Sequence, residues 1–287
     1  MQKQPMKQLF FTLVAGCLLV ACTGKKDDVQ DDDTPTDMIA EPDTIEIADP
    51  DTLQLFEERE IPQSADVLFD DFFFSFATDE RFQMQRVVFP LHGEGEEGEQ
   101  TLSQEQWAEA RLFSRQPFFS IIYDRDRDME IQKDTNLTQV SVEWIHLNDD
   151  RLERYNFNRR NGQWLLTDFQ SMAASQTPNG DFIRFYAQFV TDSVFQRESL
   201  CQPLRLISEA DDEFDEGGEM ELSPDEWFEF RKEMPMPEHV MMNINYGQPA
   251  LSENKKVLMV EGMSNGLYVR YHFDRLNERW RLMTIEN

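Results

Sequence analysis

Positive charge is scarce in this chain. Lysine and arginine together number 27, against 56 aspartates and glutamates, which gives a formal net charge of −29. Nucleic-acid binding needs clustered basic residues, and so does electrostatic docking onto anionic lipid. The composition therefore argues against both kinds of partner. It is typical of a protein with a solvated acidic surface.

The apolar run near the start of the chain is too short to cross a bilayer. Leu9–Ala21 has 13 residues, whereas a transmembrane helix needs about 20. Lys3 and Lys7 precede the run, so residues 1–22 have the charged and apolar regions of a secretory signal peptide. The run ends in Leu-Val-Ala-Cys, which resembles the lipobox of bacterial lipoproteins. That resemblance implies that Cys22 is acylated and holds the protein on a lipid bilayer.

Cysteine and histidine are also rare. Of the three cysteines, Cys17 leaves with the signal peptide and Cys22 carries lipid, so Cys201 has no partner for an intramolecular disulfide. We expect Cys201 to be a small core residue rather than a nucleophile. The four histidines have no partner at a recognisable spacing along the chain.

Residues 23–60 are acidic and poor in aromatic residues, which predicts a disordered tether. Lys25–Asp28 and the aspartates after it resemble the acidic export signal of lipoproteins of Bacteroides-type bacteria. The resemblance implies a location on the outer face of the outer membrane. Asp43–Ile45 and Asp51–Leu53 resemble O-glycosylation sites of the same bacteria, although a chance match explains such short motifs as well.

A segment rich in phenylalanine occurs twice. In Phe69–Phe76 the aromatic residues follow the spacing i, i+3, i+4, i+7 of one helix face, and Phe182–Phe189 repeats this spacing 113 residues later. The likeness continues from Leu102–Arg111 to Leu222–Arg231, and from Arg154–Leu166 to Arg270–Leu282. A period of this length is the size of a small domain. The aromatic stripe is therefore predicted to be a core-facing helix face that is used twice.

The repeat predicts two α+β domains, residues 61–173 and 178–287, joined by a short linker. Each is expected to contain the same elements. We predict the aromatic helix (66–76 and 181–191), a short second helix (82–88 and 195–201) and a helix capped by Ser103 or Ser223, with Pro224 at the first helical position. Acidic loops at residues 92–100 and 209–221 absorb the length difference.

Four strands should follow in each half. They are predicted at residues 117–124, 138–147, 154–157 and 163–169, with Asn161-Gly162 as a hairpin turn, and then at 238–246, 255–263, 267–273 and 279–285. Helices followed by an antiparallel sheet indicate an α+β fold with helices on one sheet face.

This order of elements resembles the nuclear transport factor 2-like (cystatin-like) cone. Phe82-Gln83, Phe89–Leu91, the Leu-Ser…Trp helix and the final Trp-x-Leu hairpin resemble a family of Bacteroides-type lipoproteins of unknown function with tandem domains of this kind. The resemblance implies a fold but no activity, because the wider fold group includes isomerases, dehydratases and simple binding domains.

Polar residues that occur in both halves are the candidate site. They are Arg111 and Arg231, Arg154 and Arg270, with Trp107 and Trp227 as possible pocket walls. The arginines either pair with carboxylates or meet an anionic or carbohydrate ligand inside a cone. The two tryptophans are more typical of a core. Arg159 and Arg275 flank the last turn of each half.

Metal, cofactor and catalytic sites are not predicted. Asp124–Thr135 has acids at calcium-loop positions, but Met129 and Thr135 stand where glycine and glutamate are needed, which favours a solvated strand end. The acidic loop 209–221 has oxygens for weak calcium binding without a fixed spacing. We therefore expect a non-enzymatic envelope lipoprotein that binds a small ligand or an envelope protein. The alternatives are an isomerase- or hydrolase-like enzyme using one cone pocket, and a purely structural component.

Overall fold

The computed structural model describes residues 66–113, 116–208 and 217–287, which belong to one compact unit, residues 59–287. The signal peptide, Cys22, the tether and its possible glycosylation sites lie outside the described residues, as do residues 209–216 of the second acidic loop. Among the described residues, no helix has the length and apolar character needed to cross a membrane.

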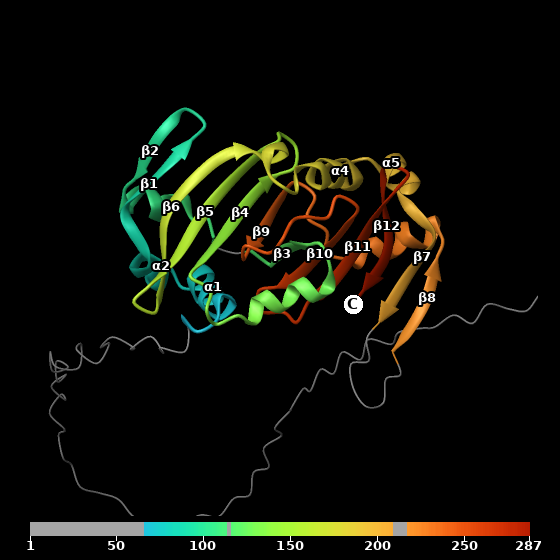
Figure 1. Cartoon of the computed structure of the whole chain (residues 1–287), viewed down its shortest axis with the longest axis horizontal. Coiled ribbons are helices and arrows are strands. Elements are labelled where there is room, and N and C mark those ends of the chain that lie inside the picture. The colour runs from blue at the N-terminus through green and yellow to red at the C-terminus, as the bar shows by residue number, and fades with distance from the viewer. Residues whose placement is uncertain (1–65, 114–115, 209–216) are drawn as a thin grey trace, which may run out of the picture. The chain divides into compact units, whose positions relative to one another are not determined.

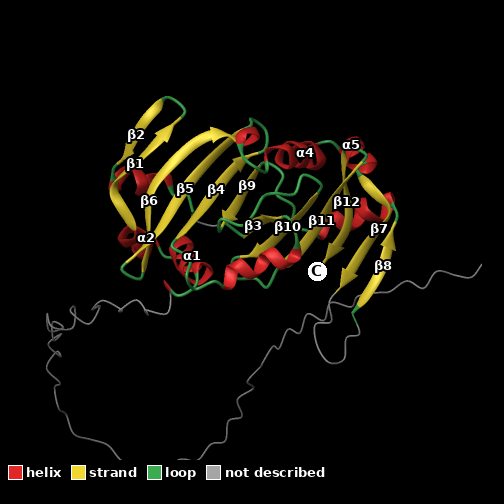
Figure 2. Cartoon of the chain, in the orientation of Figure 1, coloured by secondary structure: helices red, strands yellow, loops and turns green. Residues whose placement is uncertain are grey.

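The same series of elements occurs twice along the chain (Figures 1 and 2). The first series is α1 (Phe69–Thr78), α2 (Glu80–Arg86), β1 (Val87–Gly95), β2 (Gly98–Leu102), α3 (Gln104–Ala110), β3 (Phe118–Tyr123), η3 (Asp126–Lys133), β4 (Gln139–His146), β5 (Arg151–Arg160) and β6 (Gln163–Ala173). The second series, after η4 (Ala174–Gln176), is α4 (Gly180–Thr191), α5 (Ser193–Glu198), β7 (Leu200–Ser208), β8 (Gly218–Leu222), α6 (Pro224–Phe230), η5 (Arg231–Glu233), β9 (Val240–Asn245), β10 (Lys255–Gly262), β11 (Tyr268–Leu276) and β12 (Arg279–Glu286).

The local signals in the sequence place the helices well. Ser103 and Ser223 both form complete capping boxes, and Pro224 occupies the first helical turn. The short second helices end earlier than expected, because Val87 and Leu200 already begin strands. Asn161 and Gly162 have positive φ angles of 51° and 82°, as the predicted hairpin turn requires.

Three expectations about irregular segments are wrong. The first acidic loop, residues 92–100, is mainly the hairpin between β1 and β2, and each series therefore has six strands rather than four. The charged segment after β3 is a 3-10 helix, Asp126–Lys133, rather than a strand end. High charge density hides these elements because the side chains of a solvated hairpin carry no apolar alternation.

All of these strands form one sheet with the order β2-β1-β6-β5-β4-β9-β3-β10-β11-β12-β7-β8. The sheet is mixed rather than antiparallel, since β1 pairs with β6, β7 with β12 and β3 with β9 in parallel. The hydrophobic pattern sets which residues are buried but contains no information on strand direction. The expectation of an antiparallel sheet is therefore corrected.

The central strands are exchanged between the two series. β9 pairs with β4 and β3 pairs with β10, so each series contributes its third strand to the neighbouring series (Figure 1). The equivalent contacts in two self-contained halves would be β3 with β4 and β9 with β10. This strand order contradicts the expectation that each half is complete by itself.

The two aromatic helices pack against opposite faces of the central strands. On β3, Phe119 and Ile121 belong to the core that contains the α1 phenylalanines, whereas Ile122 belongs to the core that contains those of α4. Successive side chains of a strand point to opposite faces. The central strands are therefore buried on both sides, which explains the mainly apolar sequences of β3 and of Val257–Val260 on β10.

Candidate functional site

Aromatic side chains fill the space between each aromatic helix and the sheet. Phe72, Phe76 and Phe157 are fully buried in the first core, and Phe189 and Phe273 are fully buried in the second. Phe76 and Phe157 meet edge to face, with ring centroids 5.1 Å apart. The predicted use of the phenylalanine stripe as core is confirmed.

The two candidate tryptophans are also core residues. Trp107 is 1% exposed and Trp227 is fully buried. Trp107 Nε1 donates to Gln83 Oε1 at 2.9 Å, which satisfies its one polar atom inside the core.

The paired arginines have different surroundings in the two series. Arg231 donates to Gln196 and, at 3.0 Å, to Glu238. Arg111 ends α3 with a left-handed backbone at φ 47° and is exposed. Neither arginine lines the cavity that Arg154 lines.

Arg154 lines a small cavity of about 220 Å³ next to Glu143. Glu143 stands on β4 and its side chain is only 6% exposed, while that of Arg154, on β5, is 23% exposed. Arg154 Nε and Nη2 lie 3.0 and 2.9 Å from Glu143 Oε1. The geometry is that of a charge-assisted pair in which the arginine keeps one side toward the cavity.

The exchanged strand β9 completes this site. Asn243 Nδ2 donates to Glu143 Oε2 at 2.8 Å, and Asn245 Nδ2 donates to Oε1 at 3.1 Å. Four donor groups from two strands, β5 and β9, therefore hold the carboxylate in place. Sequence reasoning missed Glu143, because its partners from β9 are about a hundred residues away and its counterpart position in the second series, 116 residues on, is Met259.

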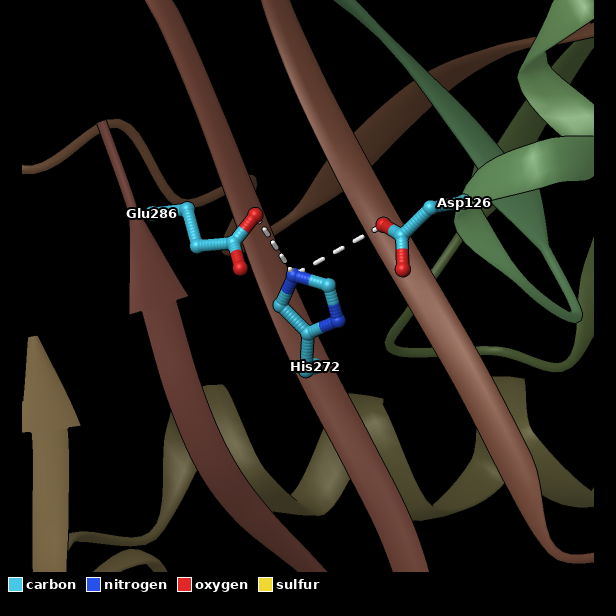
Figure 3. Close-up of side chains that lie close together, drawn as sticks. All are labelled: Asp126, His272 and Glu286. Carbon is cyan, nitrogen blue, oxygen red and sulfur yellow. Dashed lines mark ion pairs between the residues drawn. The ribbon is translucent and has the colours of Figure 1, made fainter. Parts of the chain in front are cut away.

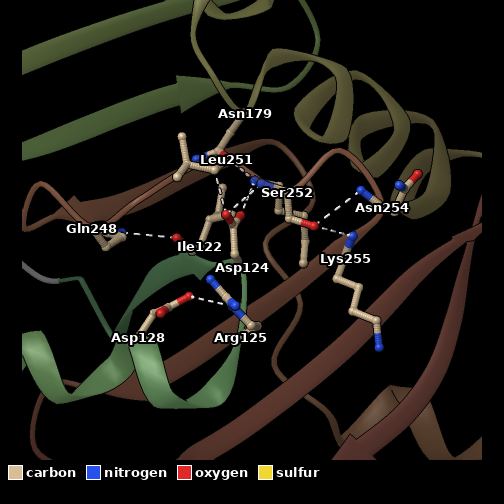
Figure 4. Close-up of polar contacts among 11 residues, drawn as sticks. Ile122, Asp124, Arg125, Asp128, Asn179, Gln248, Leu251, Ser252, Asn254 and Lys255 are labelled. Atoms are coloured by element: carbon tan, nitrogen blue, oxygen red, sulfur yellow. Dashed lines mark hydrogen bonds and ion pairs between the residues drawn. The ribbon is translucent and has the colours of Figure 1, made fainter.

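The remaining walls of the cavity are mostly apolar or weakly polar. They come from β3, from the linker, from α4 and from the loop after β9: Ile122, Thr177, Pro178, Asn179, Ile183, Gln248, Ala250 and Leu251. Figure 4 shows part of this region, with Gln248 donating to the Ile122 carbonyl oxygen at 3.0 Å and Leu251 N donating to Asp124 at 2.7 Å. Apolar walls with a few convergent polar groups are the usual make-up of a small-molecule site.

Arg270 belongs to a second polar cluster, on β11 and β12. Its Nη2 lies 2.8 Å from Glu286 Oε2, and His272 Nε2 lies 3.1 Å from the same oxygen. Asp126 is further away, at 3.9 Å from His272 Nε2 (Figure 3). It also lies 3.7 Å from Arg270 Nη1. His272 therefore has acidic partners that sequence spacing did not reveal, because they are contributed by a neighbouring strand and by η3.

Asp126, His272 and Glu286 each place a ligand atom within 4.8 Å of the others, which is close enough for a metal ion. Arg270 already supplies a fixed positive charge to both carboxylates. A metal ion would have to compete with that guanidinium, so the arrangement suits an ion-pair network better than a metal centre.

Asp70 and Tyr246 form a third buried polar group. The Tyr246 hydroxyl donates to the Asp70 carboxylate, joining α1 to the loop after β9. Burial raises the pKa of Asp70 to about 6, with a further rise from Asp71 and an opposing effect of the Tyr246 hydrogen bond. Burial also raises the pKa of Tyr123, with a further contribution from the charge of Asp70. Phenylalanine spacing identified the α1 stripe but gave no signal for this pair.

The comparisons with known proteins agree with the observed architecture. Residues 48–287 match the family model described as a domain of unknown function, DUF4348. The crystal structure of an NTF2-like protein, BF2862 from Bacteroides fragilis, is similar with a TM-score of 0.69 and 35% sequence identity, covering 77% of this chain and 96% of that chain. No curated protein matches the chain. The chain belongs to the DUF4348 family and has an α+β fold of the NTF2-like type with one large mixed sheet.

Proposed function

We propose that this protein is a non-enzymatic cell-envelope lipoprotein whose folded part binds a small ligand in the cavity beside Glu143 and Arg154. The supporting observation is the cavity itself, in which a fixed, buried ion pair adjoins apolar walls. The carboxylate of Glu143 is occupied by Arg154, Asn243 and Asn245, which leaves it poorly placed to abstract a proton.

The chemistry of the walls indicates the kind of ligand. Arg154 contacts Glu143 through Nε and Nη2. The side-chain oxygen of Asn179 accepts a hydrogen bond from Lys256 Nζ at 2.7 Å. Their other side-chain N–H groups are donors, so the ligand should carry an accepting group such as a carboxylate. Its remaining part should be short and apolar, to match Pro178, Ile183 and Leu251 within about 220 Å³.

Binding can be tested with acetate, propionate and butyrate as probes in isothermal titration calorimetry. Ala250→Phe should fill the cavity without touching the ion pair and should abolish binding. Val194→Phe is a matched control, because Val194 is 67% exposed and does not line the cavity. Equal binding by all three proteins, or none by the wild type, would overturn the proposed site.

We further propose that acylated Cys22 anchors the protein to the outer membrane, with the folded part on the cell surface. The support is the lipobox-like sequence and the acidic residues that follow it. Cys22→Ala should release the protein from the membrane fraction or leave it unprocessed. A Cys22→Ala protein that stays processed and membrane-bound would contradict the anchor. Protease added to intact cells should remove the folded part.

We also propose that the two series of elements are tandem repeats of one ancestral cone, with bounds near residues 61–173 and 178–287. The support is the internal sequence identity together with the matching order of helices and strands. The repeat explains why corresponding residues can be compared position by position, and it provides internal controls for substitution experiments.

The Asp70–Tyr246 pair favours the alternative, an enzyme. A carboxyl with a pKa of about 6 beside tyrosine hydroxyls is suited to general acid–base catalysis near neutral pH. Chromogenic esters offered to the wild type and to Asp70→Asn would test this. Turnover that is lost in a stable Asp70→Asn protein would favour the enzyme over the binding protein.

A further inference from the structure

A second hollow lies in the second series, between α4, α5 and the turn that joins β11 to β12. It has a volume of about 460 Å³ and an aromatic floor of Phe185, Phe195 and Trp280. Phe185 and Phe195 contact one another, with ring centroids 5.8 Å apart, and both are only partly buried. Partly exposed rings on the floor of a groove can hold the flat face of a ligand.

The corresponding place in the first series is filled by an arginine. Phe72 and Phe82 match Phe185 and Phe195, and the guanidinium carbon of Arg86 lies 4.7 Å from the Phe82 ring centroid and 6.0 Å from that of Phe72. Arg86 Nη2 also lies 2.8 Å from Asp66 Oδ2. Covered in this way, Phe72 is fully buried and Phe82 is 4% exposed.

The second series lacks this covering side chain. Ser199 stands 113 residues after Arg86, at the end of the matching helix, and Asn179 stands where the first series has Asp66. The groove thus includes the place that corresponds to the Arg86 guanidinium of the first series. A short side chain at position 199 exposes the aromatic floor.

Arginines gather around the opening. Four of them line the groove, against three carboxylates: Arg184, Arg275, Arg279 and Arg281, with Asp181, Glu198 and Glu278. The matched residues in the first series are Asp71, Arg159, Gln163 and Leu165, so most of this positive charge is particular to the second series. In a chain with a net charge of −29, such a local concentration of arginine is unusual.

The arginines around the groove differ in the contacts that they make with carboxylates and backbone oxygens. Arg275 Nη1 lies 3.2 Å from Asp181 Oδ2. Arg184 Nη1 lies 3.9 Å from the other oxygen of the same carboxylate, Oδ1. Arg281 Nη1 donates to the backbone oxygens of Glu198 and Leu200, at 3.0 and 3.2 Å, which orients its guanidinium beside the groove. Arg279 is exposed.

We propose that this groove is a binding site for a ring-bearing organic anion, whose ring packs on Phe185 and Phe195 and whose oxyanion pairs with Arg279 and Arg281. The planar guanidinium fork matches carboxylate and phosphate groups. A cationic ligand beside Ser199, where the first series has the Arg86 guanidinium, would be repelled by the arginines that line the groove. This site is separate from the Glu143–Arg154 cavity, with which it shares no lining residue.

The test is isothermal titration calorimetry on the folded protein with phenyl phosphate, glucuronate and inorganic phosphate. The wild type should bind phenyl phosphate or glucuronate at least tenfold more tightly than inorganic phosphate, because the last has no ring. Phenyl phosphate and glucuronate distinguish an aromatic phosphate from a sugar carboxylate. Arg279→Gln, which introduces the residue of the first series at an exposed position, should weaken binding at least tenfold.

Two further variants make the result specific. Ser199→Arg should restore the covering side chain and abolish binding, with folding checked by the melting temperature. Arg197→Gln is the charge-matched control, because Arg197 pairs with Asp225 outside the groove and should leave affinity unchanged. The proposal is overturned if inorganic phosphate binds as tightly as the better of phenyl phosphate and glucuronate, if no probe binds the wild type, or if Arg279→Gln binds as the wild type does.

Discussion

Lys256 Nζ lies 2.6 Å from Asp124 Oδ1, and the two side chains are only 3% and 1% exposed. Asp124 follows β3 and Lys256 stands on β10, so this pair lies where the exchanged strand of the first series meets the sheet of the second. Asp124 Oδ2 also accepts from the backbone of Leu251 and Ser252, each at 2.7 Å (Figure 4). One carboxylate thus joins the exchanged strand, its new neighbour and the loop that bounds the cavity beside Glu143.

Asp124→Ala should be strongly destabilising. Removing one partner of a buried ion pair leaves the other charge uncompensated, which typically costs about 3–5 kcal/mol. The double variant Asp124→Leu with Lys256→Met should recover much of this loss, because no buried charge remains. Urea unfolding of the wild type, the single variant and the double variant measures the effect. A single variant as stable as the wild type would show that Lys256 finds another partner or water.

Asp70 should make stability depend on pH. Its folded pKa is about 6, against an ordinary value of 3.8, so the folded state binds the proton more tightly than the unfolded state. The stability that this proton provides is fully present below pH 3.8 and is lost as the pH rises through 6. A shift of this size corresponds to about 3 kcal/mol at most.

Asp70→Asn cannot ionise and keeps an oxygen that can accept from Tyr246. Relative to the wild type, it should therefore gain stability as the pH rises from 4 to 7. The difference between the two proteins in urea unfolding at each pH isolates this group from the many other carboxylates. A difference that stays constant over the range would mean that Asp70 titrates normally.

The two tryptophan helices offer a matched pair of substitutions. Trp107→Phe leaves the buried Oε1 of Gln83 without its donor, whereas the Nε1 of Trp227 has no hydrogen-bond partner among the described residues. Trp107→Phe should therefore cost about 1 kcal/mol more than Trp227→Phe. Thermal unfolding of both variants measures the difference. Equal losses would show that the Gln83 hydrogen bond contributes little.

Separated halves should not fold as independent monomers. Residues 61–175 alone would leave β4 without β9, and residues 178–287 alone would leave β10 without β3. Each fragment should be insoluble, partly folded or dimeric through the same exchange, and co-expression should give a stable one-to-one complex. Light scattering after size exclusion, together with thermal melts, would decide this. Two monomeric fragments with cooperative melts would show that the exchange can be reversed at little cost.

Signals in the sequence were enough to predict several elements and to single out one residue that lines a cavity. The spacing of Phe69 and Phe72, the serine caps and the Asn161-Gly162 turn are each decided by neighbours within a few residues, and all three appear in the structure as expected. Arg154 was predicted because it occurs in both halves, and the structure places it beside the cavity. The lipobox and the acidic tether remain predictions, since they lie outside the described residues.

The sequence by itself determined which residues form helices, which faces are apolar and that the series of elements occurs twice, because these depend on short-range periodicity. Tertiary structure decided which strands are neighbours. β3 and β9 are both short and almost entirely buried, so the burial pattern of neither strand specifies its partner, and tertiary packing decides the exchange. The contacts of Glu143 with Asn243 and of Asp70 with Tyr246 depend on that selection, whereas the space beside Ser199 follows from one short side chain four residues after Phe195. Groups that meet only after chain segments about a hundred residues apart have packed together leave no local pattern to find.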